Sequence, residues 1–334
     1  MKKLKTLLFS TALAVSPNLL AKTTPVTIYA EEFFSADWGP APVVKAQFEQ
    51  KYPQCQANIV PFDSRTTLLN RVRLEGKNTQ ADIVIGLDNF QLEPAEKSGL
   101  FVPNQVALNQ LSLPITWQNH TFLPYDFGQY AFIYDKTKLT NPPQSLAELI
   151  ERQDLNVIYQ DPRTSSIGRG LLVWLNLLYP EEQIPQRWQQ LASHTVTVGK
   201  GWTETYGAFL KGEADLVMSH NTSPIYHLLQ ENKDQYVATE FSDPVLLQIE
   251  MAAKTVKGKD NLCAEHFLGF LLSPEAQQEI SRKNVMLSVT DAQVDPLFDQ
   301  LKAKQLNTKT LDSSAVSAEQ IKQWINVWQT ALIK

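Results

Sequence analysis

The chain has 334 residues, of which 43% are hydrophobic and 19% are charged, and its formal net charge is −5. This acidic balance argues against nucleic acid and anionic membrane surfaces as partners, and it favours cationic ligands. The length predicts two domains, and the presence of only two cysteines excludes a fold held together by a disulfide framework.

Residues 1 to 21 have the features of a cleaved signal peptide. A basic segment, Met1 to Lys5, precedes the apolar run Thr6 to Val15, and the best cleavage point follows Ala21. The run is too short to span a bilayer, and no cysteine follows it that could carry a lipid anchor. Export to the periplasm is therefore expected. Cleavage removes three lysines and no acid, which lowers the basic residues from 30 to 27 against 35 acidic ones, a net charge of −8.

The two cysteines, Cys55 and Cys263, lie far apart in the sequence. In an oxidising compartment they could pair, but pairing requires Cα atoms within about 7 Å, and nothing local enforces that distance. Unpaired cysteines are the favoured expectation, and a disulfide is the open alternative.

Strand and helix patterns alternate through the first part of the chain. The patterns predict a strand at 26–29, a helix at 43–51, a strand at 57–60, a helix at 66–75 and a strand at 81–87. Asp63 and Ser64 are the capping residues of the second helix. The alternation predicts a parallel or mixed sheet with helices on both faces. A long aromatic strand at 122–136 then breaks it and is expected to cross into a second lobe.

The second lobe repeats the alternation. The patterns predict a short helix opened by Ser145 and Glu148, strands at 156–159, 195–198 and 214–219, and helices at 167–179, after Trp202 and from Pro224. An apolar stretch at 246–252 is expected to return to the first lobe. Later helices start after Ser273 and Ser317, and the last one should dock through Ile321, Trp324, Ile325 and Trp328.

The predicted fold is therefore α/β with two lobes, each a mixed sheet flanked by helices, and a ligand cleft between them. Residues 22–124 and 252–334 would form the first lobe, and residues 125–251 the second. Ligands in such sheets bind at the carboxyl ends of the strands.

Polar and aromatic residues gather at those predicted strand ends. A helix start rich in hydroxyls can hold a phosphate or carboxylate, and flat aromatic rings can stack on a ligand or contact a cation. A ligand with an aromatic ring, a positive charge and a hydroxyl or phosphate end would suit this set. The candidate ligand-binding residues are Asp37, Trp38, Asp63, Ser64, Arg65, Ser165, Ser166, Trp202, His220, Asn221, Thr222, Ser223 and Tyr226.

Several of these residues also have plainer explanations. Trp38 could be a core residue, Trp202 could be a hydrophobic staple before its helix, and Ser165 could merely cap a helix. Glu31 could supply a carboxylate near a cation, but an exposed glutamate is the more frequent outcome. No metal-binding or phosphate-loop motif occurs in the sequence, so no metal or cofactor is expected.

The chain resembles the periplasmic thiamine-binding proteins of bacterial ABC importers. The resemblance covers nearly all of residues 22 to 334 and is clearest at 35–40, 68–71, 157–165, 197–202 and 223–227. It implies a type II periplasmic binding protein fold that closes on thiamine or its phosphate esters. An inner-membrane ABC permease is the implied partner, and the protein is expected to be a monomer.

The resemblance also implies roles for individual residues. Trp202 and Tyr226 would contact the thiamine rings, and Ser165 and Ser166 would contact the hydroxyethyl or phosphate end. The segments 63–65 and 220–223 would complete the pocket. The chain departs from the family at 31–34, where a tyrosine-rich stretch is frequent, and at 220–221, where a tyrosine and a threonine are usual.

A thiaminase-like enzyme on the same fold is the alternative function, and a binding protein for a related pyrimidine or another small cation is a further one. Such an enzyme needs an activated cysteine thiolate near a base. Cys263 lies in an apolar helix pattern and Cys55 lies away from the strand ends, so a receptor without catalysis is favoured.

Overall fold

The computed structural model describes residues 23–333, so the predicted signal peptide lies outside the described residues. The strands are β1 (Thr24–Glu31), β2 (Cys55–Phe62), β3 (Ile83–Asp88), β4 (Phe101–Val102), β5 (Phe122–Asp135), β6 (Val157–Gln160), β7 (Thr195–Gly199), β8 (Leu216–His220), β9 (Tyr236–Ala238), β10 (Leu247–Thr255) and β11 (Leu287–Ser288).

The α-helices are α1 (Glu32–Ser35), α2 (Ala41–Lys51), α3 (Arg65–Glu75), α4 (Leu92–Lys97), α5 (Leu146–Glu151), α6 (Ser166–Leu178), α7 (Ile184–Ala192), α8 (Trp202–Leu210), α9 (Ser223–Glu231), α10 (Leu262–Leu271), α11 (Pro274–Asn284), α12 (Pro296–Gln305) and α13 (Ala318–Leu332). Within residues 23–333, no helix combines the length and the apolar character needed to cross a membrane.

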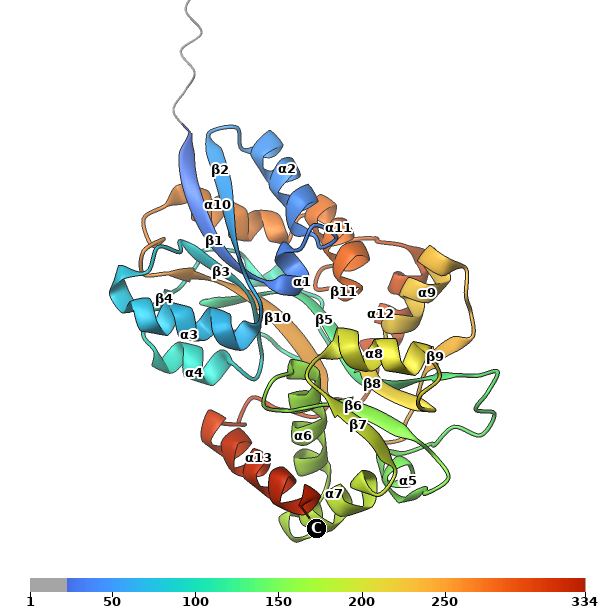
Figure 1. Ribbon diagram of the computed structural model, residues 1–334. Coiled ribbons are helices and arrows are strands. Elements are labelled where there is room, and N and C mark those ends of the chain that lie inside the picture. Colours follow the sequence, from blue (N-terminus) through green and yellow to red (C-terminus); the bar gives the residue numbers. More distant parts are fainter. Residues whose placement is uncertain (1–22, 334) are drawn as a thin grey trace, which may run out of the picture.

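The strands form a mixed sheet with the order β2-β1-β3-β10-β5-β8-β6-β7 (Figure 1). β1 runs parallel to β2 and β3, whereas β10 runs antiparallel to β3 and β5. β6 runs parallel to β7 and β8, and β8 runs antiparallel to β5. The predicted α/β class with a mixed sheet is confirmed.

One long strand joins the two halves of this sheet. β5 has 14 residues and pairs with β10 over Phe122–Gln129 and with β8 over Tyr130–Tyr134. The predicted crossing strand at 122–136 is therefore confirmed, and the predicted return at 246–252 is the antiparallel strand β10. The two lobes are parts of one sheet that continues through β5, rather than two separate sheets.

Two apolar clusters lie on either side of this crossing. The first core contains Val26 of β1, Phe48 of α2 and Phe267 of α10, and the second core contains Phe132 of β5 and Trp174 of α6. β5 contributes to both cores, because Phe122 and Phe127 lie in the first and Tyr130 and Phe132 lie in the second. In the first half, α2, α10 and α11 pack against one another, and α3 and α4 lie on the side of the sheet away from them (Figure 1).

The last helix packs on the second core. Ser317 caps α13 in a capping box with Gln320, as the sequence predicts. Ile321 and Trp328 are buried in the second core, and α13 lies against α6 and α7 (Figure 1). The predicted docking of this helix is confirmed. The bounds of the lobes stay a prediction, but residues 318–332 pack with the second core rather than with the first lobe, where the sequence placed them.

The expectation of unpaired cysteines is wrong. Cys55 at the start of β2 and Cys263 in α10 form a disulfide with a Cα–Cα distance of 5.6 Å across a sequence separation of 208. Both side chains are buried in the first core. The pairing was not visible in the sequence because it depends on tertiary packing, which brings α10 beside β1 and α2.

Candidate ligand-binding site

The start of α6 lies where β6 ends. Ser165 is the N-cap, and its Oγ accepts hydrogen bonds from the backbone N–H groups of Ile167 and Gly168. A Cβ at Gly168 would lie 2.1 Å from the carbonyl oxygen of Gln160, so only glycine lets the helix approach the strand this closely. Ser165 therefore caps the helix, while its own hydroxyl proton stays available to a ligand.

A second group of predicted residues surrounds Ser219 at the end of β8. The indole N–H of Trp202 donates to Ser219 Oγ at 2.7 Å, and the hydroxyls of Ser219 and Ser223 lie 2.8 Å apart. Trp202 stacks on Tyr206 with ring centroids 4.7 Å apart, and it is half-buried. The structure therefore fixes the plane of this indole ring and leaves part of the ring exposed.

The last residue of β8, His220, and the next residue, Asn221, form hydrogen bonds to β10 and β5. His220 Nε2 donates to Gln248 Oε1 of β10 at 3.3 Å, and the imidazole stacks on Tyr130 of β5. Burial lowers the pKa of His220 to about 4, so the ring is neutral at physiological pH. Asn221 Oδ1 accepts from the backbone N–H of Gln129, and its Nδ2 donates to Gln305 Oε1 at 3.0 Å. Both polar atoms of the Asn221 side chain are thus engaged by protein groups.

Arg65, the first residue of α3, points into a buried acidic cluster. Its Nη2 binds Glu250 Oε1, Nη1 lies 3.8 Å from Glu31 Oε2, and Nε lies 3.9 Å from Asp88 Oδ2. Asp126, fully buried on β5, adds a fourth carboxylate nearby. The Arg65 guanidinium therefore pairs with three carboxylates, and a fourth lies nearby. Arg65 is among the predicted ligand-binding residues, but its guanidinium already binds carboxylates and is almost fully buried.

Two of these carboxyl groups, Glu31 and Asp126, have raised pKa values. Burial raises the pKa of Glu31 to about 7, with Arg65 opposing and Glu250 adding to the rise. Burial and the neighbouring Glu250 also raise the pKa of Asp126 well above its usual range. A second positive charge near this cluster would favour the ionised carboxylates. The cluster is therefore suited to a neighbouring cation.

Four predicted residues remain on the surface, and one is covered. Trp38 is 55% exposed and Tyr226 is 45% exposed, so the alternative that Trp38 is a core residue is wrong. Asp37 and Asp63 are also exposed, whereas Thr222 is buried at the start of α9. Ser64, which is half-buried, caps α3 by accepting from the N–H of Thr67.

The structure joins some predicted residues and not others. Arg65, Ser166 and His220 are connected through Tyr130, Gln248 and Glu250, and Trp202 is connected to Ser223 through Ser219. The contacts of Trp38 and Tyr226 are local, with Phe33 and His227. Their part in a common pocket stays a prediction.

Sequence reasoning missed the polar residues of the crossing strands. Gln248 and Glu250 are nearly fully buried on β10, and their positions two residues apart among the apolar residues of its first half were a usable signal. The expectation that Glu31 is exposed is wrong, because its side chain is 1% exposed and caps α1 by accepting from the N–H of Phe34. A glutamate that ends a buried strand next to a helix start is the signal for that burial.

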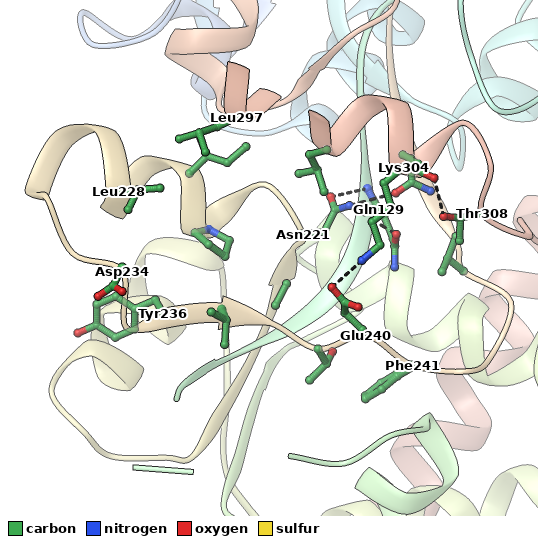
Figure 2. A pocket seen from close by; sticks show the side chains of 18 of the residues that line it. Gln129, Asn221, Leu228, Asp234, Tyr236, Glu240, Phe241, Leu297, Lys304 and Thr308 are labelled. Carbon is green, nitrogen blue, oxygen red and sulfur yellow. Dashed lines mark hydrogen bonds and ion pairs between the residues drawn. The ribbon is translucent and has the colours of Figure 1, made fainter. Parts of the chain in front are cut away.

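A cavity of about 610 Å³ has Asn221 in its wall (Figure 2). Gln129, Leu228 of α9, Tyr236 of β9 and Leu297 of α12 line it, and Figure 2 shows the pair formed by Lys304 and Glu240 at its edge. Of the predicted ligand-binding residues in the described chain, Asn221 alone lines this cavity. Residues 23–333 also hold no group of three or more His, Cys, Asp or Glu side chains placed to bind a metal.

The chain is similar to known proteins over its whole length. The model of the family described as bacterial extracellular solute-binding protein matches residues 40–283. The chain is 57% identical over 334 residues, 100% of both chains, to the thiamine-binding periplasmic protein of Haemophilus influenzae. It is 47% identical over 323 residues, 95% of this chain and 98% of the relative, to the thiamine-binding periplasmic protein of Escherichia coli.

Solved structures give the same picture of the fold. A periplasmic thiamin binding protein superposes with a TM-score of 0.83 and 45% identity, covering 93% of this chain and 96% of that one. Iron-bound HitA from Pseudomonas aeruginosa superposes with a TM-score of 0.75 and 17% identity, covering 92% and 99%. The second likeness concerns the fold alone, which is that of a two-lobed binding protein.

Proposed function

Because the chain belongs to the family of bacterial extracellular solute-binding proteins, we propose that it captures thiamine, and its phosphate esters, in the periplasm. It delivers the ligand as a monomer to an ABC importer in the inner membrane. The observation that carries the proposal is the 57% identity, over the whole chain, to a thiamine-binding periplasmic protein.

The chemistry of the described residues supports a cationic aromatic ligand. The thiazolium ring of thiamine carries a positive charge, which suits a site where three buried carboxylates lie within 4 Å of one guanidinium. Trp202 offers a partly exposed ring whose orientation is fixed by Tyr206. Ser165 and the start of α6 offer hydrogen-bond donors for the hydroxyethyl or phosphate end.

The alternative of a thiaminase-like enzyme is not favoured. That chemistry requires a free cysteine thiolate. The sequence has two cysteines, Cys55 and Cys263, and they form the disulfide. Neither sulfur can act as a nucleophile while that bond is intact.

Thiamine should bind and be released unchanged. The mature protein is mixed with excess thiamine, binding is measured by isothermal titration, and the ligand is recovered by denaturation and chromatography. Intact thiamine in stoichiometric amount is the expected result, because both cysteines that could attack the ligand are bound in the disulfide. Free pyrimidine and thiazole products would instead support the enzyme, and the absence of a binding heat would reject thiamine as the ligand.

Removal of the flat side chains should weaken binding. Trp202→Ala and Tyr226→Ala are each expected to lower the affinity for thiamine by about 1 to 3 kcal/mol, because each removes a stacking surface and a cation–π contact. Trp202→Ala should also lower thermal stability, since its ring packs on Tyr206. Tyr226→Ala should not, because that side chain is 45% exposed.

A matched control for the tryptophan is Tyr52→Ala. Tyr52 stacks on His266 with centroids 4.7 Å apart, next to the first core and away from β8. It should lose stability and keep full affinity. If Tyr52→Ala and Trp202→Ala weaken binding equally, the indole has only a structural role.

The serine pair should distinguish phosphorylated from plain thiamine. Replacing both Ser165 and Ser166 by alanine is expected to weaken the binding of thiamine monophosphate more than the binding of thiamine. The reason is that a hydrogen bond to a charged acceptor contributes about 1.5 to 3 kcal/mol, whereas a hydrogen bond to a neutral acceptor contributes about 0.5 to 1.5 kcal/mol. Backbone N–H groups remain, so the loss should be partial. Isothermal titration with both ligands measures the difference.

The control for this pair is Ser145→Ala, which removes the equivalent cap of α5. It should lower stability by roughly 1 kcal/mol and leave both affinities unchanged. Equal losses for the two ligands in the serine double variant would show that Ser165 and Ser166 act only as a helix cap.

A further inference from the structure

Gln248 occupies a special position on β10. This strand passes between the cores, because Leu246 just before it lies in the second core and Leu247 and Ile249 lie in the first. The side chain of Gln248 is 2% exposed, and its amide has hydrogen-bond partners at both ends. A buried amide in this place connects groups that belong to different halves of the molecule.

The side-chain carbonyl of Gln248 accepts hydrogen bonds from residues of the second half. Its Oε1 accepts from the hydroxyl of Tyr130 at 2.9 Å and from His220 Nε2 at 3.3 Å. The Tyr130 hydroxyl also lies 3.3 Å from the carbonyl oxygen of Ser166, the first residue of α6. A Cβ at Gly170 would lie 2.4 Å from the Tyr130 ring, so α6 packs directly on this tyrosine. The carbonyl of Gln248 thus contacts His220 directly and reaches the start of α6 through Tyr130.

The side-chain amino group of Gln248 donates a hydrogen bond within the first half. Its Nε2 donates to Glu250 Oε1 at 2.8 Å, the same oxygen that binds Arg65 at the start of α3. Glu250 Oε2 accepts from Tyr125 at 2.8 Å and from Asn284 at 3.1 Å. Glu250 therefore has donors on both oxygens, which fixes its carboxylate and orients the amide of Gln248.

The neighbours of Gln248 determine which way its side-chain amide faces. Both carboxylate oxygens of Glu250 accept hydrogen bonds, from Arg65 on Oε1 and from Tyr125 and Asn284 on Oε2, so the amino group of Gln248 must face it. The carbonyl of Gln248 then faces the donors Tyr130 and His220. No other orientation of the amide satisfies all three neighbours, and a buried polar group left without a partner costs about 1 to 3 kcal/mol.

We infer that Gln248 is a positioning residue for ligand binding, which fixes the start of α6 and the segment after β8 relative to the start of α3. The inference rests on the proposed function, since it assigns to these three segments one shared ligand. Gln248 acts through Tyr130, His220 and Glu250, and it orients the two halves of the cleft before the ligand arrives. Pre-organisation of this kind raises affinity because less order is lost on binding.

The test uses two buried glutamines. Gln248→Leu removes the bridge and keeps a side chain of similar size. Gln277→Leu is the matched control, because Gln277 is fully buried and its amide binds Tyr125 O and Leu271 O in the first half only. Spin labels are attached through Leu74→Cys on α3 and Leu210→Cys on α8, two exposed positions on different halves.

The distance between the labels in ligand-free protein gives the first result, and it does not depend on thiamine. Gln248→Leu should widen the distance distribution, and Gln277→Leu should leave it as in the parent despite a lower melting temperature. Thiamine affinity should fall about tenfold in Gln248→Leu, the equivalent of one buried hydrogen bond, and stay within about twofold in Gln277→Leu. Unchanged distances in Gln248→Leu, or equal changes in both variants, would overturn the inference.

A mutant cycle excludes a merely structural role. Tyr125→Phe and Tyr130→Phe each remove one hydroxyl at opposite ends of the bridge. Their effects on the label distances should be non-additive when Gln248 is present and additive when it is leucine. Additive effects in both backgrounds would overturn the inference. If the parent protein fails to bind thiamine but the label results hold, the proposed ligand is wrong and the positioning role of Gln248 stands.

Discussion

Replacing Arg65 by methionine is expected to lower the free energy of unfolding by about 3 to 5 kcal/mol, because it leaves a buried ion-pair partner without its counter-charge. Glu250 would lose its nearest cation, and Glu31 and Asp88 would lose the guanidinium 3.8 and 3.9 Å away. Urea unfolding followed by circular dichroism measures the loss.

The control lies on the same helix. Arg71 is half exposed and pairs with Glu75 on the surface of α3, so Arg71→Met should unfold close to the wild type. The double variant Arg65→Met/Glu250→Gln should recover part of the loss, because it removes one of the uncompensated charges. The account of the acidic cluster fails if Arg65→Met and Arg71→Met have the same stability.

Removal of the disulfide is expected to be almost as costly. For a bond that closes a sequence separation of 208, the chain-entropy model gives about 5 kcal/mol, and native disulfides typically contribute about 2 to 5 kcal/mol. Cys55→Ala/Cys263→Ala should therefore melt well below the oxidised wild type. Thermal unfolding by differential scanning calorimetry checks this result.

Two controls test whether the lower melting temperature of the double variant comes from loss of the disulfide. Wild-type protein in a reducing buffer should melt near the double variant, which removes the bond by another route. Thiamine affinity should not change, because both cysteines lie in the first core and away from the ends of β6 and β8. A double variant as stable as the oxidised wild type would mean that the bond does not restrict the unfolded chain.

Much of the fold was predictable because it depends on local patterns. Ser64, Ser165 and Ser317 cap α3, α6 and α13 as the sequence indicates, and the aromatic run at 122–136 is the crossing strand β5. Other elements have weaker signals. α12 was not predicted, although its N-cap Asp295 and first residue Pro296 repeat the pattern of Ser273 and Pro274. Its sequence lacks the apolar stripe that would have indicated a helix.

The site was predictable only where residues follow strand ends. Ser165 and Trp202 stand at such ends, and the structure gives each a defined place. Gln248 and Glu250 were missed because they lie inside a strand, where a polar residue has meaning only once its cross-strand neighbours are known. Cys55 and Cys263 were misjudged for a similar reason, since their distance is set by the packing of α10 and not by any nearby sequence.

The position of α13 has a consequence for the time at which the protein can fold. Ile321 and Trp328 fill the second core, and the Trp328 indole donates to the hydroxyl of Tyr159 at 3.1 Å. Chains are synthesised from the N-terminus, and a domain folds as a unit. A chain that ends before Ala318 lacks these two side chains, so its second core is open on one side. The second core is therefore complete only once the last helix has been made.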